Sequence, residues 1–272
     1  MEFWSNVLRI LDARMEEPTM FGWFHLLFIF LTAVAAIVFI KMNKNGEERF
    51  TRRLLIISSV IVLVLELYKQ INYSFSYDNN IITFDYQWYA FPFQFCSTPM
   101  YVGLLAGIIK NKRIHEALTA YLGTFAVFAG ICTMAYPPQM FITTIGINIQ
   151  TMVCHGLMIS TGVYLLATNY VKKEHKTILK AIPVFAACIL LAIVMNEIAN
   201  ASGLLEREDF NMFYISPHQE PSLPVYSIVQ QYVPYPWCLI IYIAAFSLAS
   251  YLMLLLAMLI SKISKKTKKA SA

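Results

Sequence analysis

The chain has 272 residues, of which 58% are hydrophobic and only 14% are charged, and its mean hydropathy is +0.58. An average soluble domain is about 45–50% apolar and about 25% charged, so this surplus of apolar residues exceeds what one water-soluble core holds. The composition excludes a disordered chain, a coiled coil and a secreted disulfide scaffold, and it indicates a polytopic membrane protein. The net charge of +5 does not indicate nucleic-acid binding, because the basic residues fall in short blocks between apolar runs.

Residues 1–20 are predicted to form an amphipathic segment that lies on the membrane surface. They contain four acidic residues and two arginines, whereas a secretory signal has a basic start and an apolar middle. Their apolar side chains recur at helical spacing: Phe3, Trp4, Val7, Leu8, Ile10 and Leu11. The sequence therefore favours a short surface helix over a signal peptide.

Seven apolar runs follow, each about 18–27 residues long, which is enough for a helix to cross a hydrocarbon core of roughly 30 Å. They cover residues 21–41, 53–72, 91–110, 115–135, 146–168, 179–199 and 235–261. The third and fifth runs carry the most polar residues and are the weakest of the seven. Because only helices and closed barrels satisfy their backbone in lipid, the pattern predicts an all-α bundle of seven transmembrane helices over residues 21–261.

The lysines and arginines predict the orientation of this bundle. Of the 21 basic residues, 17 fall in the segments 41–53, 110–113, 172–180 and 262–269, which share one side if every run crosses the membrane. We therefore expect the N-terminus outside the cell, a basic cytoplasmic tail at 262–272, and a multi-pass location in the plasma membrane.

The longest stretch that is not apolar covers residues 200–234, on the predicted outer side. Its prolines argue against one continuous helix. This loop could fold over the outer mouth of the bundle as a lid.

Ionisable side chains inside a membrane are costly, so each one within an apolar run is a candidate functional residue. At about 1.5 Å of rise per residue, the reactive side chains fall within roughly 5–15 Å of the outer boundary. They are His25, Glu66, Lys69, Cys96, His155 and Glu197. The cytoplasmic halves of the runs are nearly free of such groups, and His115 and His175 beside the basic clusters are expected at the surface. The asymmetry predicts a polar pocket that opens towards the outer leaflet.

Several of these side chains also have a purely structural interpretation. Glu66 and Lys69 share one helical face and could simply neutralise each other, or Glu66 could orient a histidine while Lys69 binds a phosphate. His25 is shallow enough to be interfacial, and Glu197 lies at a helix end where water reaches it. The five cysteines show no CxxC or zinc-ligand spacing, so most are expected to be buried small hydrophobes, and no metal or cofactor is predicted.

Cys96 and His155 form the sharper pair. A nucleophilic cysteine needs a nearby base or cation, and a histidine at matching depth on another helix could supply it. The same two side chains with His25 could instead hold a metal or haem, but nothing in their spacing favours that.

Three segments carry a family resemblance: FPFQFCSTPMYVGLLAG (91–107), VCHGLMISTGVYLLA (153–167) and NMFYISPHQEPSLPVYSIVQQYVPYPW (211–237). They resemble the YwaF-type bacterial integral membrane family, in which a proline-aromatic helix start precedes a cysteine and a His-Gly pair opens a later helix. One departure is Gln94, because a histidine is common at that position in the family.

The same family is similar to animal transmembrane protein 164, an acyltransferase that moves a fatty acyl chain between phospholipids and ether lysophospholipids through an acyl-cysteine. The resemblance implies that Cys96 matches the nucleophile and His155 the general base.

The resulting hypothesis is a cysteine-dependent acyltransferase or lipid hydrolase acting on outer-leaflet phospholipid or lysophospholipid. The candidates for hydrogen-bonding the oxyanion are Gln94, Ser97, Thr98 and Asn148. Lys69 or Arg207 could hold the lipid phosphate. The alternatives are a transporter or channel for a small solute or ion, and a receptor or scaffold without catalysis. A transporter should show polar positions at all depths, which the sequence lacks. No nucleic-acid partner is expected, and the sequence predicts no oligomeric state.

Overall fold

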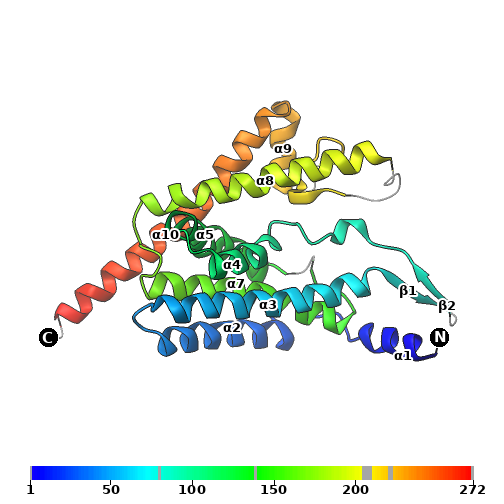
Figure 1. Cartoon of the computed structure of the whole chain (residues 1–272), viewed down its shortest axis with the longest axis horizontal. Helices are drawn as coiled ribbons and strands as arrows, with labels where there is room; N and C mark the ends of the chain where they lie inside the picture. The colour runs from blue at the N-terminus through cyan, green and yellow to red at the C-terminus, as the bar shows by residue number, and fades with distance from the viewer. Residues whose placement is uncertain (1, 79–80, 138–139, 204–209, 220–222, 271–272) are drawn as a thin grey trace.

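The computed structural model describes residues 2–78, 81–137, 140–203, 210–219 and 223–270, and these form an elongated helical bundle (Figure 1). Six helices within the described residues are long and apolar enough to cross a membrane. They are α2 (Trp23–Met42), α3 (Glu48–Asn72), α5 (Lys112–Tyr121) continued through the π-turn η2 (Leu122–Ala126) into α6 (Val127–Ala135), α7 (Ile145–Ala167), α8 (Lys176–Ser202) and α10 (Trp237–Ala270). The prediction of an all-α polytopic membrane protein is confirmed.

The third expected helix is only partly helical. The helix α4 covers Thr98–Ile108, and its 11 residues rise about 16 Å, roughly half of the hydrocarbon core. Residues 91–97 approach it in an irregular path that contains only isolated turns, and Pro92 and Pro99 limit the start of the helix. A count of seven membrane crossings therefore stays a prediction.

The helices divide into an inner and an outer set. In the helix pair α5–α6 and in α7, 78% and 72% of the apolar window is buried, against 17% in α2 and 11% in α10. The helix α7 packs against α2, α3 and α6 and lies in the middle of the bundle (Figure 1). Since α2 and α10 are apolar on nearly all sides, they are suited to face lipid, while α7 carries the polar side chains inside.

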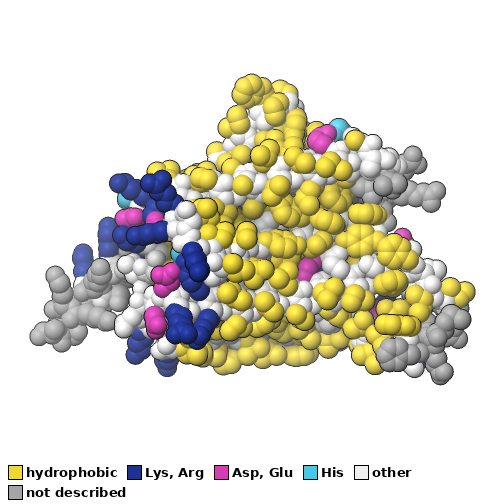
Figure 2. Space-filling model, in the orientation of Figure 1, with side chains coloured by type: hydrophobic (Ala, Val, Ile, Leu, Met, Phe, Trp, Pro, Cys, Tyr) yellow, Lys and Arg dark blue, Asp and Glu magenta, His cyan; other side chains and the backbone are white. Residues whose placement is uncertain are grey.

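Basic side chains gather at one end of the molecule, the end where the chain terminates (Figures 1 and 2). The helix α10 continues without interruption to Ala270, so the basic tail prolongs the last helix. This clustering is the feature on which the predicted orientation depends, and the side of the membrane that it faces stays a prediction.

At this basic end, two side chains hold the C-terminus of α4. Arg52 Nη1 donates to the carbonyl oxygens of Ala106, Gly107 and Ile109 at 3.2, 3.3 and 2.7 Å. The ring of His115 reaches the Ala106 carbonyl through Nδ1 at 2.8 Å. The last carbonyls of a helix have no partner within it, so these contacts replace the missing bonds.

The expectation that His115 lies at the surface is wrong, because only 6% of the residue is exposed. Its Nε2 accepts a hydrogen bond from Tyr170 Oη at 2.6 Å. Burial raises the pKa of Tyr170 to about 12, so the phenol keeps the proton that it donates. His175 does lie at the surface, with its Nδ1 2.6 Å from Tyr251 Oη.

The opposite end carries the amphipathic helix and a β-hairpin. The helix α1 (Glu2–Leu11) lies beside the end of α3, where Tyr68 Oη donates to the Leu11 carbonyl at 2.6 Å. The hairpin pairs β1 (Phe75–Asp78) with β2 (Ile81–Phe84) in antiparallel fashion. The structure thus contains the expected N-terminal helix, and its location on a membrane surface stays a prediction.

The segment between α8 and α10 folds into the bundle. Residues 210–216 include the turn η3 (Met212–Tyr214), and Met212, Phe213 and Ile215 are completely buried. Phe213 and Tyr214 adopt positive φ angles of 59° and 57°, a conformation that costs energy in bulky residues. The helix α9 (Pro224–Tyr232) follows, and Arg207 lies outside the described residues.

Two side-chain amides hold this buried turn in place, one from α8 and one from the irregular segment before α4. Asn196 of α8 bonds both the N–H and the carbonyl of Met212, at 2.8 and 3.1 Å. Gln94 accepts from the N–H of Phe213 at 2.9 Å and donates to the carbonyl of Asn211 at 3.0 Å. Residues 210–213, 215 and 216 of the predicted lid are therefore packed inside the protein, whereas α9 keeps an exposed face that includes Ile228 and Tyr232.

Candidate functional site

Cys96 lies two residues before the first residue of α4 and is half-buried. Its Sγ atom is 3.8 Å from the Thr133 hydroxyl of α6. The N-terminus of a helix carries a partial positive charge, which stabilises negative charge placed beside it. The position suits a sulfur atom that must develop negative charge.

His155 lies in the middle of α7 and only 7% of the residue is exposed. Its Nδ1 is 2.7 Å from the carbonyl oxygen of Thr151, and because a carbonyl only accepts, Nδ1 must carry the proton. The other nitrogen, Nε2, is buried and has no hydrogen-bond partner among the described residues. His155 therefore presents an unused lone pair in a dry environment.

One turn of α6 contacts both Cys96 and His155. Thr133 contacts the Cys96 sulfur, and Gly130, one turn earlier on the same face, packs against the backbone of His155. A Cβ atom at Gly130 would lie 3.1 Å from the His155 carbonyl oxygen. Within the described residues, Sγ and Nε2 are not hydrogen-bonded to each other, so their direct contact stays a prediction.

A buried charged network flanks this pair. Glu66 is 5% exposed, and its Oε1 lies 2.8 Å from Lys69 Nζ. Gln70 and Gln150 donate to the two carboxylate oxygens at 2.8 and 3.0 Å. The ion pair and the amides together compensate for the removal of the Glu66 charge from water.

Lys69 links the network to the reactive pair, because it lies within electrostatic range of both Cys96 and His155. Its side chain is 16% exposed, so its ammonium group is largely shielded from water. A cation in such a place attracts an anionic group more strongly than it would in water.

The network continues outwards to Tyr86. Its phenol donates to Gln70 Oε1 at 2.5 Å, and Gln70 in turn donates to the Ala90 carbonyl at 2.9 Å. Burial and then the nearby Glu66 carboxylate raise the pKa of Tyr86 to about 12, so its proton stays in this bond. The hydrogen bonds tie α3 to the irregular segment that leads to Cys96.

Three other predicted site residues make structural contacts. His25 is fully buried, with Nδ1 accepting from the Phe21 N–H at 3.0 Å and Nε2 2.8 Å from the Met134 carbonyl. Asn148 bonds both backbone groups of Ile142, at 3.0 and 2.6 Å. The amide of Gln94 is occupied by the buried turn at 211–213. Their contact with a substrate stays a prediction.

Several residues of the site were not singled out from the sequence. Gln150 and Thr151 come one helical turn before Cys154 and His155, so helical spacing places them on the same face. Thr133 gave no such signal, because only the packing of α6 brings it to Cys96. No cluster of three or more potential metal-ligating side chains was found in the part of the chain that the structure describes.

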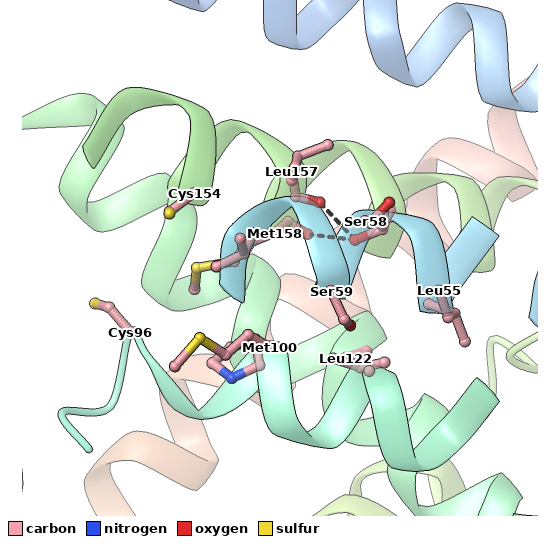
Figure 3. Close-up of a pocket in the computed structure, with 13 residues that line it drawn as sticks. Leu55, Ser58, Ser59, Cys96, Met100, Leu122, Cys154, Leu157 and Met158 are labelled. Carbon is pink, nitrogen blue, oxygen red and sulfur yellow. Dashed lines mark hydrogen bonds between the residues drawn. The ribbon is translucent and has the colours of Figure 1, made fainter. Parts of the chain in front are cut away.

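A narrow cavity of about 30 Å³ extends from Cys96 between α3, α4 and α7. Figure 3 shows Cys96 and Cys154 at one end of this cavity, Met100 and Met158 next to them, and Leu55 and Leu122 at the far end. We call this cavity the interhelical groove. It places the sulfur of Cys96 at the end of a mainly apolar passage that runs along the helices.

The long apolar helices and the polar site buried among them define a multi-pass integral membrane protein. The model of the TMEM164 family matches residues 20–254, and the chain belongs to this family. Searches among curated proteins and among solved structures give no match.

Proposed function

We propose that the protein is a membrane acyltransferase, or a lipid hydrolase of the same mechanism, that acts on outer-leaflet phospholipid or lysophospholipid. Cys96 is the nucleophile and His155 the general base. The observation that carries the proposal is the buried, unpartnered Nε2 of His155 in the same part of the bundle as the Cys96 thiol. The membership of the TMEM164 family supports it, as does the resemblance of residues 91–107 and 153–167 to a bacterial family that is similar to transmembrane protein 164.

The fixed tautomer of His155 suits a base. Its Nδ1 proton is held by the Thr151 carbonyl, so Nε2 is the nitrogen that accepts a proton. The Cys96 thiol proton passes to Nε2, and the sulfur bonds to the carbonyl carbon of a lipid ester. The bond from that carbon to the lysolipid oxygen then breaks, and this oxygen takes the proton from His155.

The second half of the reaction reverses these transfers. An acceptor hydroxyl gives its proton to Nε2 and takes the acyl group from the sulfur, which regains the proton from His155. Water in place of the acceptor gives hydrolysis. We assign the oxyanion of each tetrahedral intermediate to the Thr133 hydroxyl, because this hydroxyl lies 3.8 Å from Sγ.

Lys69 is the residue that we assign to the lipid phosphate. Its ammonium group bonds one carboxylate oxygen of Glu66, and Glu66 also receives bonds from Gln70 and Gln150. A phosphate that takes up the Lys69 donors would leave Glu66 with its two amide partners. A charge-assisted bond of this kind is stronger than one between neutral groups.

The test is acyl exchange from labelled phospholipid to lysophospholipid by the purified protein in nanodiscs. Cys96→Ala and Cys96→Ser are expected to fold and to lose the exchange, because a serine hydroxyl is far less acidic than a thiol. Cys132→Ala is the matched control, since Cys132 adjoins Thr133 on α6 but is exposed. Full exchange in Cys96→Ala would remove the covalent mechanism.

A further inference from the structure

The interhelical groove has a regular construction along three elements. Its lining residues recur at positions i, i+3, i+4 and i+7 within residues 55–62 of α3, 96–103 at the start of α4, and 154–161 of α7. Residues at this spacing share one face of a helix. Three such faces therefore turn towards one passage that runs parallel to the helices.

The register of the helices gives the passage a direction. The helix α4 runs antiparallel to α3, and Gly103 lies against Ser59, whose hydroxyl would be 2.5 Å from a Cβ atom at that glycine. Gly103 thus marks the inner end of the groove, seven residues from Cys96. Leu122, the first residue of the π-turn η2, is 4% exposed and helps to close that end (Figure 3).

The length of the groove matches part of a fatty acyl chain. Seven residues of a helix rise about 10 Å. An extended chain of single bonds advances about 1.2 Å per bond, as the polypeptide backbone does, so about eight carbon atoms cover this distance. Most of the side chains along it are apolar or small, and they surround a passage that begins at the reactive sulfur.

We infer that the acyl chain carried by Cys96 lies in this groove and that the groove selects unbranched chains over their first eight or so carbons. The inference rests on the proposed function and adds to it where the chain lies and what it must look like. Because Leu122 closes the far end, the remainder of a longer chain turns out between the helices into the surrounding lipid.

The methionines explain how a narrow groove admits a chain. The cavity of about 30 Å³ is far smaller than the roughly 150 Å³ cavity that admits one benzene molecule, so side chains must move before a chain enters. Met100 and Met158, 3% and 6% exposed, line the groove near Cys96. Methionine has three rotatable bonds and a polarisable sulfur, and it adapts to irregular apolar shapes. A linear chain is accommodated by rotation of these two side chains, whereas a methyl branch requires the helices to separate.

The experiment offers the protein phospholipids with three acyl chains: linear, methyl-branched at carbon 6, and methyl-branched at carbon 14. The mass of the intact protein reports the adduct, and Cys96→Ala shows whether the adduct is on Cys96. We expect linear and carbon-14-branched chains to load equally and the carbon-6 branch to load about tenfold less, since one methylene in an apolar pocket changes selection by about 10-fold or more.

Met158→Ala is expected to restore loading of the carbon-6 branch by removing side-chain volume beside Cys96. If Met158→Ala does not fold, Met100→Ala on α4 is expected to restore loading of the carbon-6 branch in the same way. Ile57→Ala, on the exposed face of α3, is the matched control and should keep the preference. Equal loading of all three chains on Cys96 would overturn the groove as the acyl site. Absence of any adduct, including the linear one, would overturn the proposed function instead.

Discussion

The surroundings of His25 and those of His155 show two uses of a buried histidine. His25 is fully buried and both ring nitrogens are bonded, to the Phe21 N–H and to the Met134 carbonyl. His155 is almost as buried, yet only Nδ1 has a partner among the described residues. A buried polar atom without a hydrogen bond costs free energy, so such an atom needs an explanation other than stability.

The hydrogen bonds of the two histidines indicate a structural role for His25 and a chemical role for His155. His25 ties α2 to the end of α6, and its ring also packs against Phe141, with the ring centroids 5.9 Å apart. The Nε2 atom of His155 bonds none of the described residues, and His155 directly follows Cys154, which lines the interhelical groove. The two histidines should therefore respond in opposite ways to the same substitution.

The largest expected effect is on catalysis. Removing a general base typically lowers a rate by about 10²–10⁴-fold, so His155→Ala should lose that much acyl exchange. Its thermal unfolding should change little, because the Thr151 carbonyl that accepts from Nδ1 lies in the backbone of the same helix. The measurement is the exchange rate per folded molecule together with the unfolding temperature. An unchanged acyl-exchange rate in His155→Ala would show that His155, like His25, has only a structural role.

The converse is expected for His25→Ala. The change removes two buried hydrogen bonds and leaves the Met134 carbonyl without its partner, at about 1–3 kcal/mol for each unsatisfied group. The free energy of unfolding should fall by about 3 kcal/mol, while the exchange rate per folded molecule is retained. Denaturant unfolding in detergent checks the first part. A selective loss of exchange with unchanged stability would erase the distinction between the two histidines.

How far the sequence predicts this arrangement depends on how local each feature is. Apolar run length is local, so six of the seven predicted spans and the N-terminal helix appear as helices in the structure. The positions of Cys96 and His155 along those runs also identified them as candidate site residues at similar depth in the membrane. The break before α4 was not predicted, because residues 91–97 are mostly apolar whether they are helical or extended.

Long-range pairing lies beyond what one sequence reveals. Gln94 meets the backbone of Phe213 across 119 positions, and His115 meets Tyr170 across 55. Neither partner follows from spacing along a helix, so His115 was expected at the surface. For the same reason, nothing in the sequence showed that His25 would be fully bonded and His155 only half bonded.

The smallest expected effect concerns the buried turn that follows α8. Gln94→Ala removes both amide contacts to the turn, in which Phe213 and Tyr214 hold strained positive φ angles. We expect a loss of about 1–2 kcal/mol in unfolding free energy and faster hydrogen exchange at the Phe213 amide. Asn196→Ala is the matched control, because it frees the adjacent Met212 backbone instead. Unchanged exchange at Phe213 would show that Gln94 does not hold the turn.

The most direct test of the account is the rate at which a small alkylating reagent modifies Cys96 in the wild-type protein, His155→Ala and His25→Ala. Mass spectrometry of the Cys96 peptide gives the rate, and it does not require a lipid substrate. If Nε2 of His155 accepts the thiol proton, His155→Ala should slow the alkylation by about tenfold or more, while His25→Ala leaves it unchanged. Equal rates in all three proteins would contradict the pairing of Cys96 with His155 and favour a transporter or a scaffold.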